Sequence, residues 1–111
     1  MRLKDKIAIV TGAGSGFGRG IALRFAAEGA RVVVNDLNAE NGVHTVENIT
    51  EAGGDARFMA GDVSRDADVR RLVEFTLATF GGVKHSGHGR EKGFEALYGF
   101  TSLKTVVLRH G

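Results

Sequence analysis

Glycines are concentrated in one short segment, 11–20, where their spacing suits the binding of a phosphate group. An apolar run, 7–10, precedes this segment, and a helical pattern follows it. In that order Gly12 can adopt the positive φ of a tight turn, Gly16 lets a pyrophosphate approach the backbone, and Gly18 lets the helix pack closely on the strand. The N–H groups and the dipole at the helix start favour an anion. The alternative is a glycine-rich loop that joins a strand to a helix and binds nothing.

The order Thr11-Gly12-x-x-x-Gly16-x-Gly18 resembles the cofactor motif of the short-chain dehydrogenase/reductase family. The resemblance extends from about residue 3 to about residue 80. It implies that the chain binds NAD(H). It also implies that Ser15 and Phe17 contact the cofactor together with the three glycines.

Two carboxylates stand at the ends of the second and third apolar runs. Asp36 follows the glycines by about twenty residues, where a carboxylate accepts both ribose hydroxyls of the adenosine and repels a 2′-phosphate. Neither Leu37 nor Ser15 brings a positive charge, so we expect NAD rather than NADP. The family resemblance implies that Asp62 and Val63 meet the adenine. The alternatives are a solvated carboxylate at a strand end for Asp36 and a cap of the next helix for Asp62.

Strands and helices alternate along the first 80 residues. Apolar runs predict strands at 6–10, 31–36 and 56–60, and helical spacing predicts helices at 16–28, 38–52 and 64–80. We expect Asn38 and Ser64 as N-caps, and Gly29 as the end of the first helix. Three residues of the second helix are expected to point inward: Val43, Val46 and Ile49. The predicted fold class is α/β, a truncated Rossmann-like parallel sheet in the order 3-2-1 with flanking helices and one added C-terminal strand.

The family pattern ends near Phe80, and the next residues resemble another family. Residues 80–91 read Phe-Gly-Gly-x-Lys-x-Ser-Gly-x-Gly-Arg-Glu, as in the C-terminal segment of aldehyde dehydrogenases. This resemblance implies a tail with a glycine-rich loop, a short helix around 91–98 and a strand around 103–109. We therefore divide the chain into a partial dinucleotide-binding domain, 1–82, and an aldehyde-dehydrogenase-like tail, 83–111. Our hypothesis is a fusion of the two, joined at the shared Phe-Gly-Gly run.

The catalytic pattern of the short-chain family, a serine and a Tyr-x-x-x-Lys pair, is missing from these 111 residues. Tyr98 is the only tyrosine, and Lys104 follows it by six positions rather than the four that would share a helix face. We therefore expect no catalytic residue in this chain. One alternative is a reductase that recruits groups from a partner chain and uses Tyr98, Ser102 and Lys104. Another is a non-catalytic, self-assembling fusion protein with a relic cofactor loop.

Length and composition narrow the remaining possibilities. With 111 residues, 42% hydrophobic and 25% charged, the chain reads as one soluble domain. We expect a cytoplasmic protein, since neither a membrane span nor a signal peptide is visible. The absence of cysteine excludes disulfides and thiolate chemistry, and His85 and His88 alone make a poor metal site. The basic residues of the tail lack interleaved aromatics, so nucleic acid is not an expected partner.

The predicted sheet creates one problem for the chain. Its first strand, Ile7 to Val10, would be an exposed apolar edge, which invites pairing with another strand. The β-branched run from Thr105 to Leu108 can cover that edge, within one chain or by exchange between chains. We expect a homo-oligomer, formed through the C-terminal strand or the exposed sheet edge.

Overall fold

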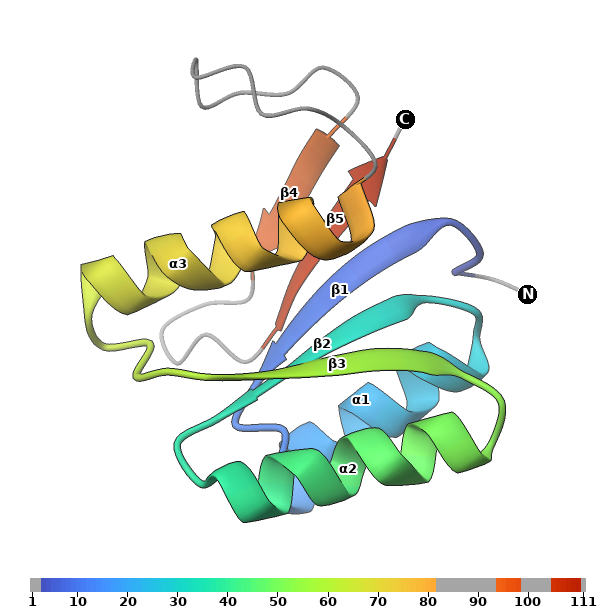
Figure 1. The fold of residues 1–111 in the computed structure, drawn as a ribbon. Coiled ribbons are helices and arrows are strands. Elements are labelled where there is room, and N and C mark those ends of the chain that lie inside the picture. Colours follow the sequence, from blue (N-terminus) through green and yellow to red (C-terminus); the bar gives the residue numbers. More distant parts are fainter. Residues whose placement is uncertain (1–2, 82–93, 99–104, 111) are drawn as a thin grey trace.

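A single five-stranded sheet with helices on both faces forms the fold (Figure 1). The computed structural model describes residues 3–81, 94–98 and 105–110. The strands are ordered β3-β2-β1-β5-β4 across the sheet. The elements are β1 (Lys6–Thr11), α1 (Gly16–Ala27), β2 (Arg31–Asp36), α2 (Ala39–Glu51), β3 (Asp55–Ala60), α3 (Asp66–Thr76), the π-helical turn η1 (Leu77–Gly81), β4 (Phe94–Tyr98) and β5 (Thr105–His110).

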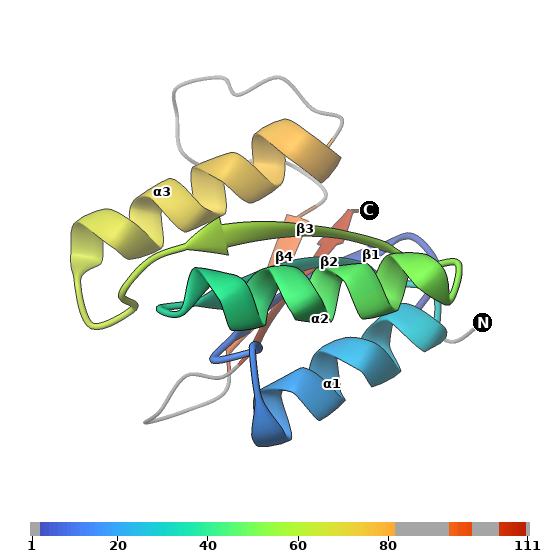
Figure 2. The same ribbon diagram turned by 60° about the horizontal axis from the view of Figure 1, so that its bottom comes forward.

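The parallel part of the sheet confirms the predicted 3-2-1 order. β1 pairs with β2 and β2 with β3, all parallel, so that Val10, Val34 and Phe58 stand side by side. α3 covers one face of these strands, and α1 and α2 cover the other (Figure 2). Because both faces are covered, the apolar residues of β2 are fully buried. Because the three strands are parallel, their carboxyl ends lie at the same edge of the sheet.

The predicted helix ends are confirmed for α1 and α2 and wrong for α3. Gly29 and Gly53 follow α1 and α2 with φ angles of 100° and 93°, the left-handed conformation that glycine adopts without a Cβ clash. The Asn38 side chain accepts a hydrogen bond of 2.9 Å from the Asn41 N–H and so caps α2. Ser64 does not cap α3: Arg65 holds the N-cap position, and the Ser64 hydroxyl donates to Asp62 instead.

The helix α2 is rotated about its axis relative to the prediction, so that a different set of residues faces the sheet. Ile49 is buried and Val46 is partly buried, as expected, but Val43 is 43% exposed. Gly42 takes the inward place because the helix lies directly on the Phe58 ring, where any Cβ would overlap the ring. This close approach turns Val43 toward solvent. It also brings Thr45, fully buried, to the side of the helix that faces the sheet and the glycine turn.

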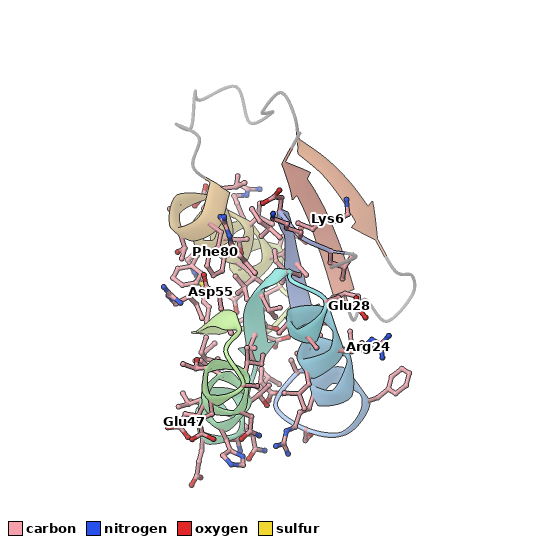
Figure 3. All side chains as sticks on the ribbon, turned by 90° about the vertical axis from the view of Figure 1, so that its right-hand side faces the viewer. Lys6, Arg24, Glu28, Glu47, Asp55 and Phe80 are labelled. Atoms are coloured by element: carbon pink, nitrogen blue, oxygen red, sulfur yellow. The ribbon has the colours of Figure 1, made fainter. Side chains whose placement is uncertain are left out.

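Phe80 is buried at the end of the helical segment formed by α3 and η1. After α3 the chain continues as η1, which buries the Phe80 side chain at the amino end of the parallel strands. The Arg57 guanidinium lies 5.5 Å from the Phe80 ring and pairs with Asp55 at 2.7 Å, and Arg31 donates to the Phe80 carbonyl at 3.2 Å. Figure 3 shows Phe80 and Asp55 close together, on the side of the sheet away from the Arg24–Glu28 ion pair of α1.

The C-terminal residues correct one prediction and confirm another. Residues 94–98 form a strand, β4, so the helix expected around 91–98 is wrong. The segment is too short for a stable helix, and its Phe and Tyr favour a strand that pairs with β5. The strand expected around 103–109 is present as β5.

β5 lies antiparallel along β1, from Lys6 opposite Arg109 to Val10 opposite Thr105, so the β1 edge is covered within the chain. The predicted glycine-rich loop, His85, His88, Ser102 and Lys104 lie outside the described residues. Among the helices that the structure describes, none is long and apolar enough to cross a membrane.

Candidate functional site

Three loops meet where the parallel strands end. β1 leads into the glycine turn, β2 ends at Asp36, and β3 leads through Gly61 to Asp62. The register of the strands places Asn35 beside Thr11 on one side and beside Met59 on the other. The glycine turn, Asp36 and Asp62 therefore lie at one edge of the sheet. Open α/β sheets bind ligands at this edge, outside the carboxyl ends of the strands.

The glycine turn has the conformation that its residue types predict. Gly12 and Gly16 have φ angles of 63° and 56°, which side chains rarely tolerate. Gly18 is buried at the start of α1, and a Cβ there would overlap the Gly12 carbonyl, 2.8 Å from its carbon and nearer to its oxygen. Gly18 thus allows the helix to pack on the turn, whereas a Cβ on Gly16 would meet no atom within 4 Å. The open space at Gly16 leaves room for a ligand to approach the backbone.

The start of α1 can receive an anion. Ser15 is the N-cap and has an extended backbone, with φ of −156°. In this described segment the Ser15 side chain makes no capping hydrogen bond, and the first turn of α1 holds no acidic residue. The first-turn N–H groups have no intrahelical partner, and they carry the positive end of the helix dipole. A phosphate at this position would satisfy them.

Asp36 is tied to the backbone on both of its carboxylate oxygens. One oxygen, Oδ2, accepts a 2.8 Å hydrogen bond from the Gly14 N–H, and the other, Oδ1, accepts one of 2.8 Å from the Asn38 N–H. The side chain is half-buried, so it is fixed in place but still open to solvent. Each carboxylate oxygen offers two lone pairs. The group can therefore accept further hydrogen bonds, as from a ribose diol, without releasing the turn.

Asp62 makes a local turn at the end of β3. Its carboxylate accepts hydrogen bonds from the Ser64 hydroxyl at 2.6 Å and from the Ser64 N–H at 2.9 Å. These two hydrogen bonds, chiefly the one from the Ser64 hydroxyl, and the charge of Arg65 hold the pKa of Asp62 below its ordinary value. The Asp62 N–H donates to Asp68 at 2.9 Å. The loop that carries Asp62 and Val63 is thereby held against the start of α3.

Two large apolar side chains project from this edge into solvent. Phe17 is 81% exposed and Leu37 is 74% exposed. Phe17 belongs to the first turn of α1, and Leu37 follows Asp36 directly. Val63, by contrast, packs partly buried against the core under α3. Exposed apolar groups beside fixed polar ones suit a ligand with flat, apolar rings next to phosphates and hydroxyls.

The structure adds three residues to the site that the sequence did not single out. Gly14 faces Asp36 and Asn41, and a Cβ there would lie 2.8 Å from the Asp36 Oδ2. Asn35 is buried, and its amide donates to the Met59 carbonyl at 3.0 Å and to the Gly61 carbonyl at 3.3 Å. Thr45 donates to the Ala13 carbonyl at 2.9 Å. Asn35 and Thr45 could have been found from the sequence, because each is a polar residue on an otherwise apolar face of its strand or helix.

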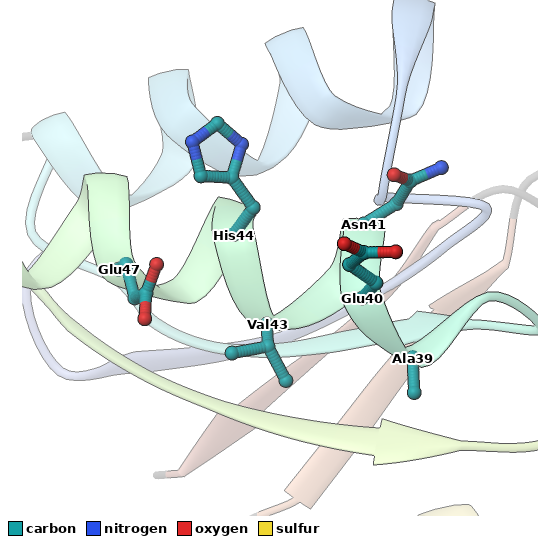
Figure 4. Close-up of a pocket in the computed structure, with 6 residues that line it drawn as sticks. All are labelled: Ala39, Glu40, Asn41, Val43, His44 and Glu47. Atoms are coloured by element: carbon teal, nitrogen blue, oxygen red, sulfur yellow. The ribbon is translucent and has the colours of Figure 1, made fainter.

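A shallow hollow on α2 lies beside this edge rather than in it. Exposed residues of that one helix line it: Ala39, Glu40, Asn41, Val43, His44 and Glu47 (Figure 4). A surface formed by a single helix face provides no opposing wall for a ligand. In the described part of the chain no three histidine or acidic side chains come together in a way that could hold a metal ion.

Comparison with known proteins agrees with this geometry. The profile of the short chain dehydrogenase family matches residues 6–85. The chain belongs to the short chain dehydrogenase family. An uncharacterized oxidoreductase of Thermotoga maritima is 46% identical over 81 residues, which are 73% of this chain and 32% of that protein. The 7alpha-hydroxysteroid dehydrogenase of Escherichia coli K12 is 38% identical over 99 residues, 86% of this chain and 39% of the relative.

Solved structures also match three quarters of the chain. A hydroxysteroid dehydrogenase from Escherichia coli matches with a TM-score of 0.71 and 41% identity, covering 75% of this chain and 35% of the other. A 7 alpha-hydroxysteroid dehydrogenase in complex with NADH and 7-oxo glycochenodeoxycholic acid matches equally well, over 75% of this chain and 32% of the other. The chain spans about a third of the length of the curated relatives that it matches.

Proposed function

We propose that this chain binds NAD(H) through the adenosine half of the cofactor, as part of an oxidoreductase of the short chain dehydrogenase family. The observation that carries the proposal is the glycine turn held opposite a carboxylate, with the Gly14 N–H 2.8 Å from Asp36. The NADH complex of the 7 alpha-hydroxysteroid dehydrogenase, 41% identical where it matches, supports it further.

The residues of this edge fit the parts of NAD(H). The N–H groups at the start of α1 and the open backbone at Gly16 suit the pyrophosphate, with Gly12, Ser15, Phe17 and Gly18 forming the turn around it. Asp36 suits the ribose hydroxyls and disfavours the 2′-phosphate of NADP(H). Two apolar residues, Leu37 and Val63, and the Asp62 loop are proposed to contact the adenine. When bound, the cofactor donates or accepts a hydride.

We propose that this chain alone does not supply the acid/base groups that catalysis requires. The 111 residues contain no Tyr-x-x-x-Lys pair, and the side chains of the family's acid/base step have no counterpart on β1 to α3. Turnover that relies on Tyr98, Ser102 and Lys104 is the alternative. A panel of alcohols and ketones with NAD(H) separates the two, since turnover by the isolated chain would refute the first.

The test of cofactor binding is a calorimetric titration with NADH. A half-site predicts saturable but weak binding, with Kd on the order of 0.1 mM or weaker. Gly16→Val places a β-branched residue at a φ of 56°, which we expect to lower stability by about 1–2 kcal/mol. Its side chain also fills the open space proposed for the pyrophosphate, so we expect the affinity for NADH to fall roughly tenfold.

Gly53→Val is the matched control for Gly16→Val. Gly53 also has a positive φ, 93°, and open space at its Cβ, but it lies after α2, away from the site. We expect Gly53→Val to lower stability by about as much as Gly16→Val does. Because the strain at Gly53 stays local, the dissociation constant for NADH should remain within about twofold of that of the unchanged chain. Equal losses in both variants, or no binding of NADH at millimolar concentration by the unchanged chain, would contradict the proposal.

We also propose that 83–111 is a separate segment of aldehyde-dehydrogenase-like origin that serves self-assembly. The antiparallel pairing of β5 with β1 supports a strand added to the edge of the parallel sheet, and β4 then forms the outer edge. Unpaired edges favour association of copies. We expect light scattering at micromolar concentration to give a mass above that of one chain. A monomer with a cooperative unfolding transition would count against assembly.

A further inference from the structure

One peptide group of the glycine turn is held at both ends. The Ala13 carbonyl accepts the Thr45 hydroxyl at 2.9 Å, and the Gly14 N–H donates to the Asp36 Oδ2 at 2.8 Å. This carbonyl and this N–H belong to the same planar amide. Thr45 comes from α2 and Asp36 from β2, so two different elements fix the plane of that peptide.

The Thr45 hydroxyl donates its hydrogen bond to the turn rather than to its own helix. Its side chain is fully buried, and a helical threonine usually bonds only to the carbonyl four residues earlier. Here the Asn41 carbonyl lies at 3.3 Å and the Ala13 carbonyl at 2.9 Å, so the shorter bond leads out of the helix to the turn. A hydroxyl has one proton, and the distances favour giving it to Ala13.

The rest of the turn cannot replace this hydrogen bond. The Ala13 N–H donates to the Asn35 carbonyl at 3.0 Å, which fixes the peptide before Ala13 but leaves the next one free to rotate. Ala13 and Gly14 are both buried, so water is a poor substitute partner for the peptide that joins them. Without the Thr45 hydroxyl, only Asp36 would orient the Ala13–Gly14 amide.

We propose that Thr45 is a positioning residue for the cofactor site: through the Ala13–Gly14 peptide it sets the place of the Asp36 carboxylate and hence the preference for a ribose diol over a 2′-phosphate. The inference rests on the proposed binding of NAD(H). Because Thr45 is fully buried, we expect it to make no direct contact with the ligand. Its effect is transmitted by one amide and one hydrogen bond.

Thr45→Val removes the hydroxyl and keeps the shape of the side chain. We expect the Gly14 amide to exchange its hydrogen at least about tenfold faster, since its amide plane loses one of two fixed ends. We also expect the ratio of NADPH to NADH dissociation constants to fall about fivefold, because a less fixed carboxylate discriminates less. Thr45→Ser restores the hydroxyl and should return both values to within about twofold of the unchanged chain.

Thr76→Val is the matched control. Thr76 is equally buried on α3, and its hydroxyl donates to the Leu72 carbonyl four residues earlier at 2.7 Å, with no link to the turn. Its loss should lower thermal stability and leave both the Gly14 exchange rate and the cofactor ratio unchanged. Thr45→Ala, a second hydroxyl-free variant of smaller volume, should behave as Thr45→Val does if the latter folds poorly.

The outcomes separate the two proposals. Unchanged Gly14 exchange and an unchanged cofactor ratio in the hydroxyl-free variants would overturn the positioning role, whatever the change in stability. Failure of Thr45→Ser to restore the two readouts would overturn it as well. Faster Gly14 exchange in a chain that never binds NADH would overturn the NAD(H) proposal and the cofactor role of Thr45, and would leave only a structural clamp.

Discussion

Gly18→Ala is expected to destabilise the fold by about 2–3 kcal/mol and to abolish measurable NADH binding, although it adds a single methyl group. The added Cβ would overlap the carbonyl of Gly12, the first residue after β1. Gly12 cannot move aside easily, because its φ of 63° and the pairing of β1 on both sides fix it. α1 must therefore shift away from the turn. That shift separates the helix N–H groups from the position where a phosphate would lie.

Gly20→Ala provides the comparison within the same helix. Gly20 lies two residues farther along α1, and a Cβ there would meet no atom within 4 Å. We expect stability to rise by up to about 1 kcal/mol, because alanine favours the helix over glycine. Urea unfolding of both variants measures the difference. If Gly20→Ala also loses stability, or Gly18→Ala loses none, the overlap with the Gly12 carbonyl is not what constrains this turn.

The elements of the first 80 residues follow from local patterns. Short apolar runs define β1, β2 and β3, and glycines with positive φ end α1 and α2. The 3-2-1 order follows from right-handed crossovers between parallel strands. The turn at Gly12, the close approach at Gly18 and the place of Asp36 at a strand end follow for the same reason, because each is a backbone feature that the sequence marks directly.

Contacts between elements could not be predicted in the same way. The rotation of α2, which exposes Val43 and buries Thr45, follows from Gly42 lying on the Phe58 ring, a contact between residues 16 positions apart. Ser64 has the residue type of an N-cap, but the nearer Asp62 carboxylate takes its hydroxyl. Local propensity cannot rank a cap against a competing acceptor.

The C-terminal correction has a similar physical cause. Residues 94–98 adopt a strand because β5 offers them a ladder of backbone hydrogen bonds, and β5 is itself placed by the open edge of β1. The helix was expected from a resemblance in sequence alone, which takes no account of neighbouring strands. In this fold, pairing with β5 determines the secondary structure of residues 94–98.

Asp36 combines two tasks that its substitutions can separate. Its carboxylate holds the Gly14 N–H and the Asn38 N–H, and in our proposal it also accepts the ribose diol. In this chain, removal of the carboxylate would also leave the buried Gly14 N–H without its acceptor, a loss of about 1–3 kcal/mol. A change meant to admit NADP(H) would therefore also loosen the turn that we propose to bind the pyrophosphate.

Asp36→Ala is consequently expected to weaken NADH binding by about 30- to 100-fold, the equivalent of 2–3 kcal/mol, without a matching gain for NADPH. Asp36→Asn keeps an acceptor oxygen for Gly14 and removes only the charge, so it should retain more stability and lose mainly the discrimination between the two cofactors. Asp55→Ala, which removes an exposed carboxylate at the amino end of β3, controls for net charge. Calorimetric titrations with NADH and NADPH compare the three variants. If Asp36→Ala and Asp36→Asn bind NADH equally well, the hydrogen bond to Gly14 contributes nothing to the site, and charge alone explains the preference.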